Sequence, residues 1–215
     1  MDRSPTLDIP RLRGRLHQAA FWVSLPAGFS VIAMARTEAA RAAVIVYALT
    51  LSGLYAASAA YHRGRWSPKM WAWMRRLDHS MIFLFIAGSY TPLSLLVLRP
   101  PWSTRVLAVV WGGAAIGIAL KLFVRGWAAV AQVLYMTLGW LAIFILPQLV
   151  ATMSGLAIGL LFGGGVLYTA GAIVFGLQRP NPIPQVFGFH EVWHALVIFG
   201  SLCHYILILL ILVKA

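Results

Sequence analysis

The sequence is poor in charged residues, and above all in acidic ones. Only 10% of its 215 residues are charged and only five are Asp or Glu, whereas 61% are hydrophobic. Ordinary soluble domains carry about 25% charged residues. A soluble chain of this length could not bury so much apolar surface, and apolar runs of about 20 residues recur, each long enough to cross a bilayer as a helix. The composition excludes an ordinary soluble domain and predicts one integral membrane domain.

The chain also has only one cysteine, Cys203, which lies in an apolar run. A single cysteine excludes a disulfide framework within the chain, and we interpret it as a small packing residue. The net charge of +12 raises nucleic acid as a partner. In a chain this apolar, however, basic loops are expected to face anionic lipid headgroups. We therefore predict membrane lipids, and no nucleic acid, as partners.

Hydropathy predicts an all-α integral membrane protein, a bundle of seven transmembrane helices. The expected spans are 17–35, 42–61, 77–98, 104–122, 128–148, 154–176 and 189–212. Residues 1–16 would form a basic cytoplasmic tail, and residues 17–215 a single membrane domain. The connection 63–76 mixes tryptophans with basic residues, which is typical of an interfacial anchor. Gly155, Gly159 and Gly163 predict close approach of a neighbouring helix to the sixth span.

The first span could also be a signal peptide, because Ala33-Met34-Ala35 loosely fits a cleavage site. We expect a retained helix, since the run is long enough to span and acidic residues precede it. Twelve of the 17 Lys and Arg residues lie in the tail and in the connections after the second, fourth and sixth spans. The positive-inside rule then predicts a cytoplasmic N-terminus, an outside C-terminus and location in the cytoplasmic membrane.

Several ionisable residues lie in or beside the apolar spans, where they are costly and usually functional. The predicted topology brings the end of the second span and the starts of the third and seventh to one face of the membrane. These three segments carry Ser58, His62, Asp78, His190 and His194. We therefore expect five sequence-distant polar side chains to converge in one layer.

This convergence predicts a zinc site. His190 and His194 share one helix face, and His62 from another helix supplies a third nitrogen. Three neutral imidazoles suit Zn²⁺ and leave one coordination position for water. Asp78 would act as a base towards that water or orient a histidine. Ser58 would hold a ligand or donate to a developing oxyanion.

The other histidines and Glu191 are expected to lie outside this site. We interpret His17 as interfacial, His79 as a packing or hydrogen-bonding residue and His204 as a satisfied interior residue. His190 to His194 also matches the H-E-x-x-H pattern of zinc proteases, in which Glu191 would be the general base. If Asp78 is the base, Glu191 is free to pair with one of the interfacial arginines, namely Arg75, Arg76 or Arg179.

These motifs resemble the hemolysin III family, bacterial relatives of the progestin and adiponectin receptor group. The family pattern is S-x-x-x-H in the second helix, an aspartate opening the third and H-x-x-x-H in the seventh. It is matched here by Ser58 to His62, by Asp78 and by His190 to His194. The resemblance spans about residues 17–212. It implies seven helices and a zinc ion near the cytoplasmic face, with the three histidines as ligands and the serine and aspartate beside them.

The resemblance also implies a function. The wider superfamily includes alkaline ceramidases, which cleave the amide of a sphingolipid. The expectation is a zinc-dependent hydrolase of lipid amides or esters that acts in membrane lipid homeostasis. Three alternatives stay open: a non-catalytic zinc-stabilised sensor or receptor-like regulator, a membrane-permeabilising hemolytic protein, and an intramembrane metalloprotease.

Overall fold

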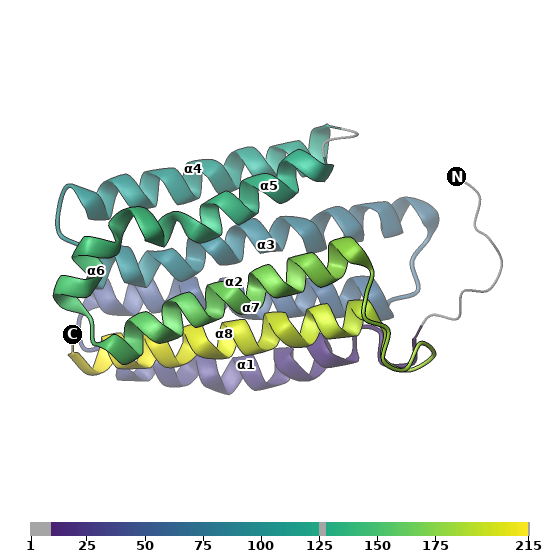
Figure 1. Cartoon of the computed structure of the whole chain (residues 1–215), viewed down its shortest axis with the longest axis horizontal. Helices are drawn as coiled ribbons and strands as arrows, with labels where there is room; N and C mark the ends of the chain where they lie inside the picture. Colours follow the sequence, from purple (N-terminus) through teal and green to yellow (C-terminus); the bar gives the residue numbers. More distant parts are fainter. Residues whose placement is uncertain (1–9, 125–127, 215) are drawn as a thin grey trace.

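The computed structural model describes residues 10–124 and 128–214, which form a bundle of long helices lying side by side (Figure 1). The described residues contain seven helical spans that are long and apolar enough to cross a membrane, which makes the chain a seven-transmembrane bundle. The helices are α1 Arg15–Met34, α2 Glu38–Arg63, α3 Pro68–Leu96, α4 Trp102–Phe123, α5 Ala128–Gly139, the 3-10 helix η1 Trp140–Ile145, α6 Leu146–Thr152, α7 Gly155–Leu177 and α8 Phe189–Lys214. Residues of α5, η1 and α6 together make the fifth span, Val130–Thr152.

The predicted spans agree with the helices except at the start of α3. That helix begins at Pro68, nine residues before the expected span, after Ser67 accepts a hydrogen bond from the backbone N–H of Met70. Most of the expected connection 63–76 is therefore helical. Hydropathy missed these turns because it marks where a helix becomes apolar, whereas the cap and the N-terminal proline mark where it begins.

The fifth span changes its helical form because a tyrosine hydroxyl inserts into it. The hydroxyl of Tyr90 on α3 donates to the carbonyl of Gly139 at 2.9 Å and accepts from the N–H of Ala142 at 2.8 Å. It thereby satisfies two backbone groups where α5 gives way to η1. α3 is in this way tied to the fifth span as well as packed against α2 and α4.

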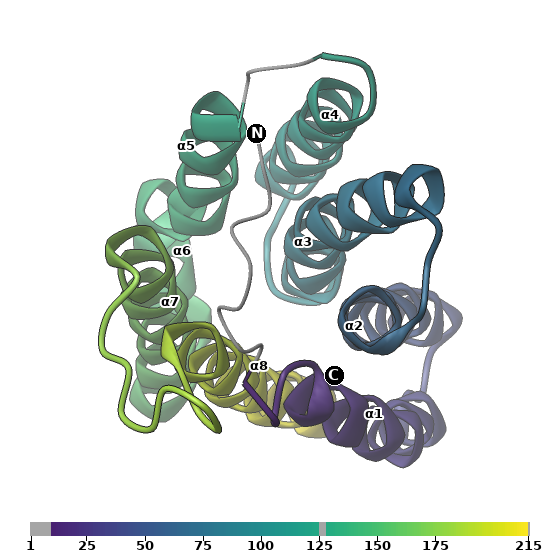
Figure 2. The ribbon, with the colours of Figure 1, turned by 90° about the vertical axis from the view of Figure 1, so that its right-hand side faces the viewer.

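Viewed along the bundle, the helices form a ring in the order α1, α2, α3, α4, α5, α7 and α8, which closes between α8 and α1 (Figure 2). The core includes the fully buried Tyr47 of α2 and Phe83 of α3. Phe83 lies so close to α4 that a Cβ on Gly117 would be 2.3 Å from its ring.

The predicted close approach of a neighbouring helix to the glycine stripe of α7 was wrong. A Cβ at Gly155, Gly159 or Gly163 would meet no described atom within 4 Å. α8 instead approaches α7 at Gly164 and Gly171, where His204 and Trp193 fill the space. Four-residue spacing was read correctly as a stripe, but spacing alone does not say which stripe faces the neighbour.

Candidate metal centre

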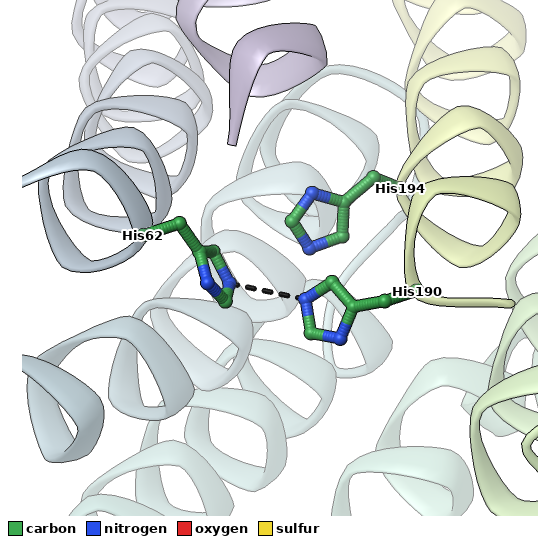
Figure 3. A group of neighbouring side chains, drawn as sticks. All are labelled: His62, His190 and His194. Atoms are coloured by element: carbon green, nitrogen blue, oxygen red, sulfur yellow. Dashed lines mark hydrogen bonds between the residues drawn. The ribbon is translucent and has the colours of Figure 1, made fainter. Parts of the chain in front are cut away.

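Three histidines meet at the end of the bundle where α2 ends and α1, α3 and α8 begin; we call this the histidine end. His62 comes from the last turn of α2, and His190 and His194 from the first turns of α8 (Figure 3). One ring nitrogen of each lies within 4.8 Å of the others. The Nε2 atoms of His62 and His190 are 3.1 Å apart. His190 and His194 are buried, and His62 is partly buried.

This arrangement fits a metal ion. Zinc bonds histidine nitrogen at about 2.0–2.1 Å in tetrahedral sites, which places ligand nitrogens about 3.3 Å apart. One pair of nitrogens is already near that separation, and the third is within a small side-chain movement of it. The donors are imidazoles from two helices, a set that suits zinc, copper, iron or nickel. The three-histidine cluster can therefore hold a metal ion.

His17 belongs to the surroundings of this centre, and its interpretation as interfacial was wrong. Its side chain is 4% exposed. Its ring stacks on that of His194 with centroids 3.8 Å apart and planes 5° from parallel. A signal for this was present, because the first span starts at the same face as the third and seventh. The depth argument that gathered the other five residues applies equally to His17.

Asp78 of α3 and Ser58 of α2 line the same cavity as His194. Both side chains are buried, and the Ser58 hydroxyl approaches the Asp78 carboxyl. Among the described residues, Asp78 makes no ion pair with Arg75 or Arg76. Those two arginines lie instead over the rings of tryptophans on the outer surface of α3. The carboxyl of Asp78 is therefore available to the cavity that it lines.

Glu191 pairs with a residue that the sequence analysis did not consider. Its Oε1 accepts a hydrogen bond from Nε of Arg13 at 2.6 Å, and its Oε2 accepts from the backbone N–H of Gly188 at 2.9 Å. The expected partners Arg75, Arg76 and Arg179 form no ion pair with it in the described structure. Both oxygens of the H-E-x-x-H glutamate are thus already engaged by the protein.

A cavity runs from His194 into the bundle. Ser58, Asp78 and His194 line its polar end. Its walls are mainly apolar and come from α2, α3, α5, η1, α7 and α8, among them Leu54, Phe85, Phe162 and Leu207. The volume of the cavity is about 130 Å³. Since Tyr47 also lines it, the cavity extends about 16 Å along α2 from Ser58 at 1.5 Å per residue.

His204 lies deeper in the same cavity, as a satisfied interior residue. Its Nε2 lies 3.2 Å from the carbonyl oxygen of Leu161 on α7. Its ring meets that of Tyr168 edge to face, with centroids 5.3 Å apart. This confirms the sequence interpretation and leaves His204 outside the metal-capable cluster.

Comparison with known proteins identifies a family for this chain. A model of the family described as haemolysin-III related matches residues 6–205. The chain is 36% identical to Hemolysin-3 of Bacillus cereus over 183 residues, which is 83% of this chain and 80% of that protein. It is 36% identical to the Hemolysin-3 homolog of Bacillus subtilis (strain 168) over 139 residues, 64% of this chain and 62% of that protein.

A more distant relative comes from an animal. The chain is 28% identical to the Monocyte to macrophage differentiation factor of Homo sapiens over 170 residues, 74% of this chain and 66% of that protein. The aligned parts of the B. subtilis and human relatives are thus under two thirds of their lengths. The family match covers nearly the whole chain, from before the first span to Tyr205 in the seventh, and includes His62, His190 and His194. This multi-pass membrane protein belongs to the haemolysin-III related family.

Proposed function

We propose that this protein is a zinc-dependent hydrolase that cleaves an amide or ester of a membrane lipid and acts in membrane lipid homeostasis. One observation carries the proposal: His194 of the metal-capable cluster lines, together with Asp78 and Ser58, the polar end of an elongated, mainly apolar cavity inside a membrane bundle. An amphiphile fits this layout. Its polar linkage would lie at the histidine end and its acyl chain between the helices.

The residues of the centre have different roles in the proposed reaction. His62, His190 and His194 would hold the zinc ion, which would supply the Lewis acid for a carbonyl and for water. Asp78 accepts the proton of the attacking water and returns it to the leaving amine or alcohol. Ser58 holds the Asp78 carboxyl in place or donates a hydrogen bond to the oxyanion. The acyl chain is positioned by the apolar walls of the cavity.

The contacts of Glu191 support Asp78 as the base. A general base needs a free oxygen facing the water from which it takes the proton. Arg13 and Gly188 occupy the two oxygens of Glu191, whereas Asp78 forms no ion pair among the described residues and lines the cavity. Because both oxygens of Glu191 are engaged, we interpret the H-E-x-x-H segment as a metal-binding helix and not as the active site of a metalloprotease.

Orientation and location follow the basic residues. We infer a cytoplasmic N-terminus, residence in the cytoplasmic membrane and a lipid substrate drawn from the inner leaflet, because most Lys and Arg residues belong to connections at the histidine end.

The testing experiment has two stages. Elemental analysis of purified wild type, His62→Ala and His194→Ala should give near one zinc per chain in wild type and loss in both variants. Wild type in lipid vesicles is then offered fluorescent lipid amides and esters, with His62→Ala as the metal-deficient control. Turnover by wild type alone supports the proposal, and zinc without turnover of any lipid contradicts it. Zinc retained in His62→Ala but lost in His194→Ala removes His62 from the ligand set and favours the protease.

The same vesicles test permeabilisation, which the name of the B. cereus relative raises. They carry a self-quenched dye. Release of dye by wild type without lipid turnover favours a hemolytic protein over a hydrolase.

A second candidate is a non-catalytic zinc staple in a membrane sensor or regulator. The ligands come from α2 and α8, which are not adjacent in the ring because α1 packs between them (Figure 2). A metal ion would cross-link these helices and stabilise the bundle. In that case zinc removal lowers the melting temperature while every lipid tested stays intact.

A further inference from the structure

The chain segment before α1 lies against the metal centre. The backbone N–H of Arg11 donates to the carbonyl of Gln185 at 3.0 Å, and that of Leu12 to Val186 at 3.2 Å. These bonds attach residues 10–14 to the loop between α7 and α8. We call residues 10–14 the N-terminal strap. It joins two parts of the chain about 175 residues apart, at the point where the loop leads into the ligand-bearing start of α8.

Arg13 anchors the strap to α8. The side chain of Glu191 is 2% exposed and that of Arg13 is 22% exposed, and the two meet at 2.6 Å. A carboxylate buried this deeply is costly unless it is paired and hydrogen-bonded. Glu191 satisfies that need with Arg13 on one oxygen and Gly188 on the other. Because Glu191 lies between His190 and His194, the ion pair fixes the very turn of α8 that carries two of the three candidate ligands.

Gly14 brings the strap against the third candidate ligand. A Cβ at this position would lie 2.7 Å from Cβ of His62 and 3.0 Å from Cγ of Arg63. Its φ of +74° is also one that favours glycine. Three residues later, the ring of His17 stacks on His194. The strap and the first turn of α1 therefore contact α2 and α8 at the same time.

We propose that the N-terminal strap is a closing and positioning element of the metal centre, latched by the Arg13–Glu191 ion pair. It holds the α2 and α8 ligands at their mutual spacing and slows exchange of the metal with the aqueous phase. Glu191 is in this view a positioning residue and not a base. The inference rests on the proposed metal centre but not on hydrolysis.

The test measures how fast zinc leaves. Full-length zinc-loaded protein in detergent is mixed with a chromogenic chelator. Arg13→Gln should release zinc about tenfold faster than wild type, because it removes a charge-assisted hydrogen bond from a buried carboxylate. Arg13→Lys, which keeps the charge, should restore part of the retention. Arg11→Gln is the matched control, since Arg11 meets the loop through its backbone, and its rate should stay within about twofold of wild type.

Further variants separate the latch from general stability. Glu191→Gln should accelerate release in the same direction, and adding it to Arg13→Gln should give less than the product of the single effects, as for two partners in one interaction. Gly14→Ala keeps the ion pair but forces a methyl group towards His62, so it should also accelerate zinc release. It replaces Arg13→Gln as the test if Arg13→Gln does not fold. The visible spectrum of the cobalt-substituted protein should change in Gly14→Ala and not in Arg11→Gln.

Each outcome has a distinct meaning. Wild-type release rates in both Arg13→Gln and Gly14→Ala would overturn the strap while leaving the metal centre standing. Equal acceleration in Arg11→Gln, together with an equal fall in the melting temperature of the metal-free protein, would also overturn it, because loss of stability would then explain the effect. Wild type without bound zinc would overturn the metal centre and the strap together. Zinc retention without lipid turnover would contradict the hydrolase alone.

Discussion

Helix α8 places the same residue type in two regions with opposite outcomes. In its first turns, His190 and His194 face His62 with no carbonyl oxygen paired to their ring nitrogens among the described hydrogen bonds. Ten residues after His194, His204 lies at 3.2 Å from the carbonyl oxygen of Leu161 and packs against Tyr168. Both regions line one cavity. A histidine becomes a candidate ligand here because its nitrogen is left facing other nitrogens, and not because it is buried.

The two regions also differ in what supports them. The histidine end is held by a buried ion pair, by the stack of His17 on His194 and by the contact of Gly14 with His62. The region around His204 is held by close packing, since a Cβ on Gly164 of α7 would lie 2.6 Å from its ring. The first region is polar and assembled from several chain segments, whereas the second is a tight contact between two neighbouring helices. Mutations should therefore separate metal binding from packing.

The largest expected effect is on metal affinity. His190→Ala should weaken zinc binding by more than the roughly 10–100-fold that loss of a residue supporting a ligand costs. His204→Ala, on the same helix and in the same cavity, should bind zinc as wild type does. Competition with a zinc chelator of known affinity measures both. Equal losses of zinc affinity in the two variants would show that the two regions do not differ in metal binding.

The next effect is on turnover. Asp78→Asn keeps the shape of the side chain but removes its basicity, so kcat for a cleavable lipid should fall by about 10²–10⁴-fold. Zinc content should stay at the wild-type level, because the three histidines are unchanged. Lipid product measured by mass spectrometry alongside elemental analysis checks both. Wild-type kcat in Asp78→Asn would transfer the base role to another group.

Topology made most of the centre predictable from sequence. His190 and His194 are four residues apart, which fixes them on one helix face, and alternating span direction fixes the depth of His62 and Asp78. His17 was missed only because the same depth rule was not applied to it. The stripe in α7 was assigned to the wrong glycines, since spacing does not reveal which side meets α8.

The partner of Glu191 was beyond the reach of sequence for a different reason. Arg11, Arg13 and Arg15 are alternatives of equal chemistry before or at the start of α1, and periodicity says nothing about a segment that precedes a helix. The choice of Arg13 depends on the turn at Gly14 and on backbone bonds to the α7–α8 loop. Long-range contacts of irregular segments have no local pattern, so only the folded chain reveals them.

A smaller effect concerns the region of the cavity beyond the centre. A Cβ at Gly165 would lie 3.7 Å from the ring of Trp140, which is ordinary contact, so Gly165→Ala should be tolerated while it narrows the cavity. Each methylene of an acyl chain excluded from an apolar wall loses about 0.8 kcal/mol. The variant should prefer lipids with shorter acyl chains than wild type does, measured as kcat/KM over a series of chain lengths. Its zinc content should be unchanged. An unchanged series would mean that the chain lies elsewhere.

The smallest expected effect is on stability, in the region around His204. His204→Phe keeps an aromatic ring against Tyr168 and Gly164 but leaves the carbonyl of Leu161 without its partner nitrogen. Loss of one hydrogen bond of this kind costs about 1 kcal/mol of unfolding free energy. Zinc affinity should stay at the wild-type value, and the melting temperature of the metal-free protein should fall by a few degrees. A melting temperature that falls only in the zinc-loaded protein would instead tie His204 to the metal centre, because a packing residue must act whether or not the ion is present.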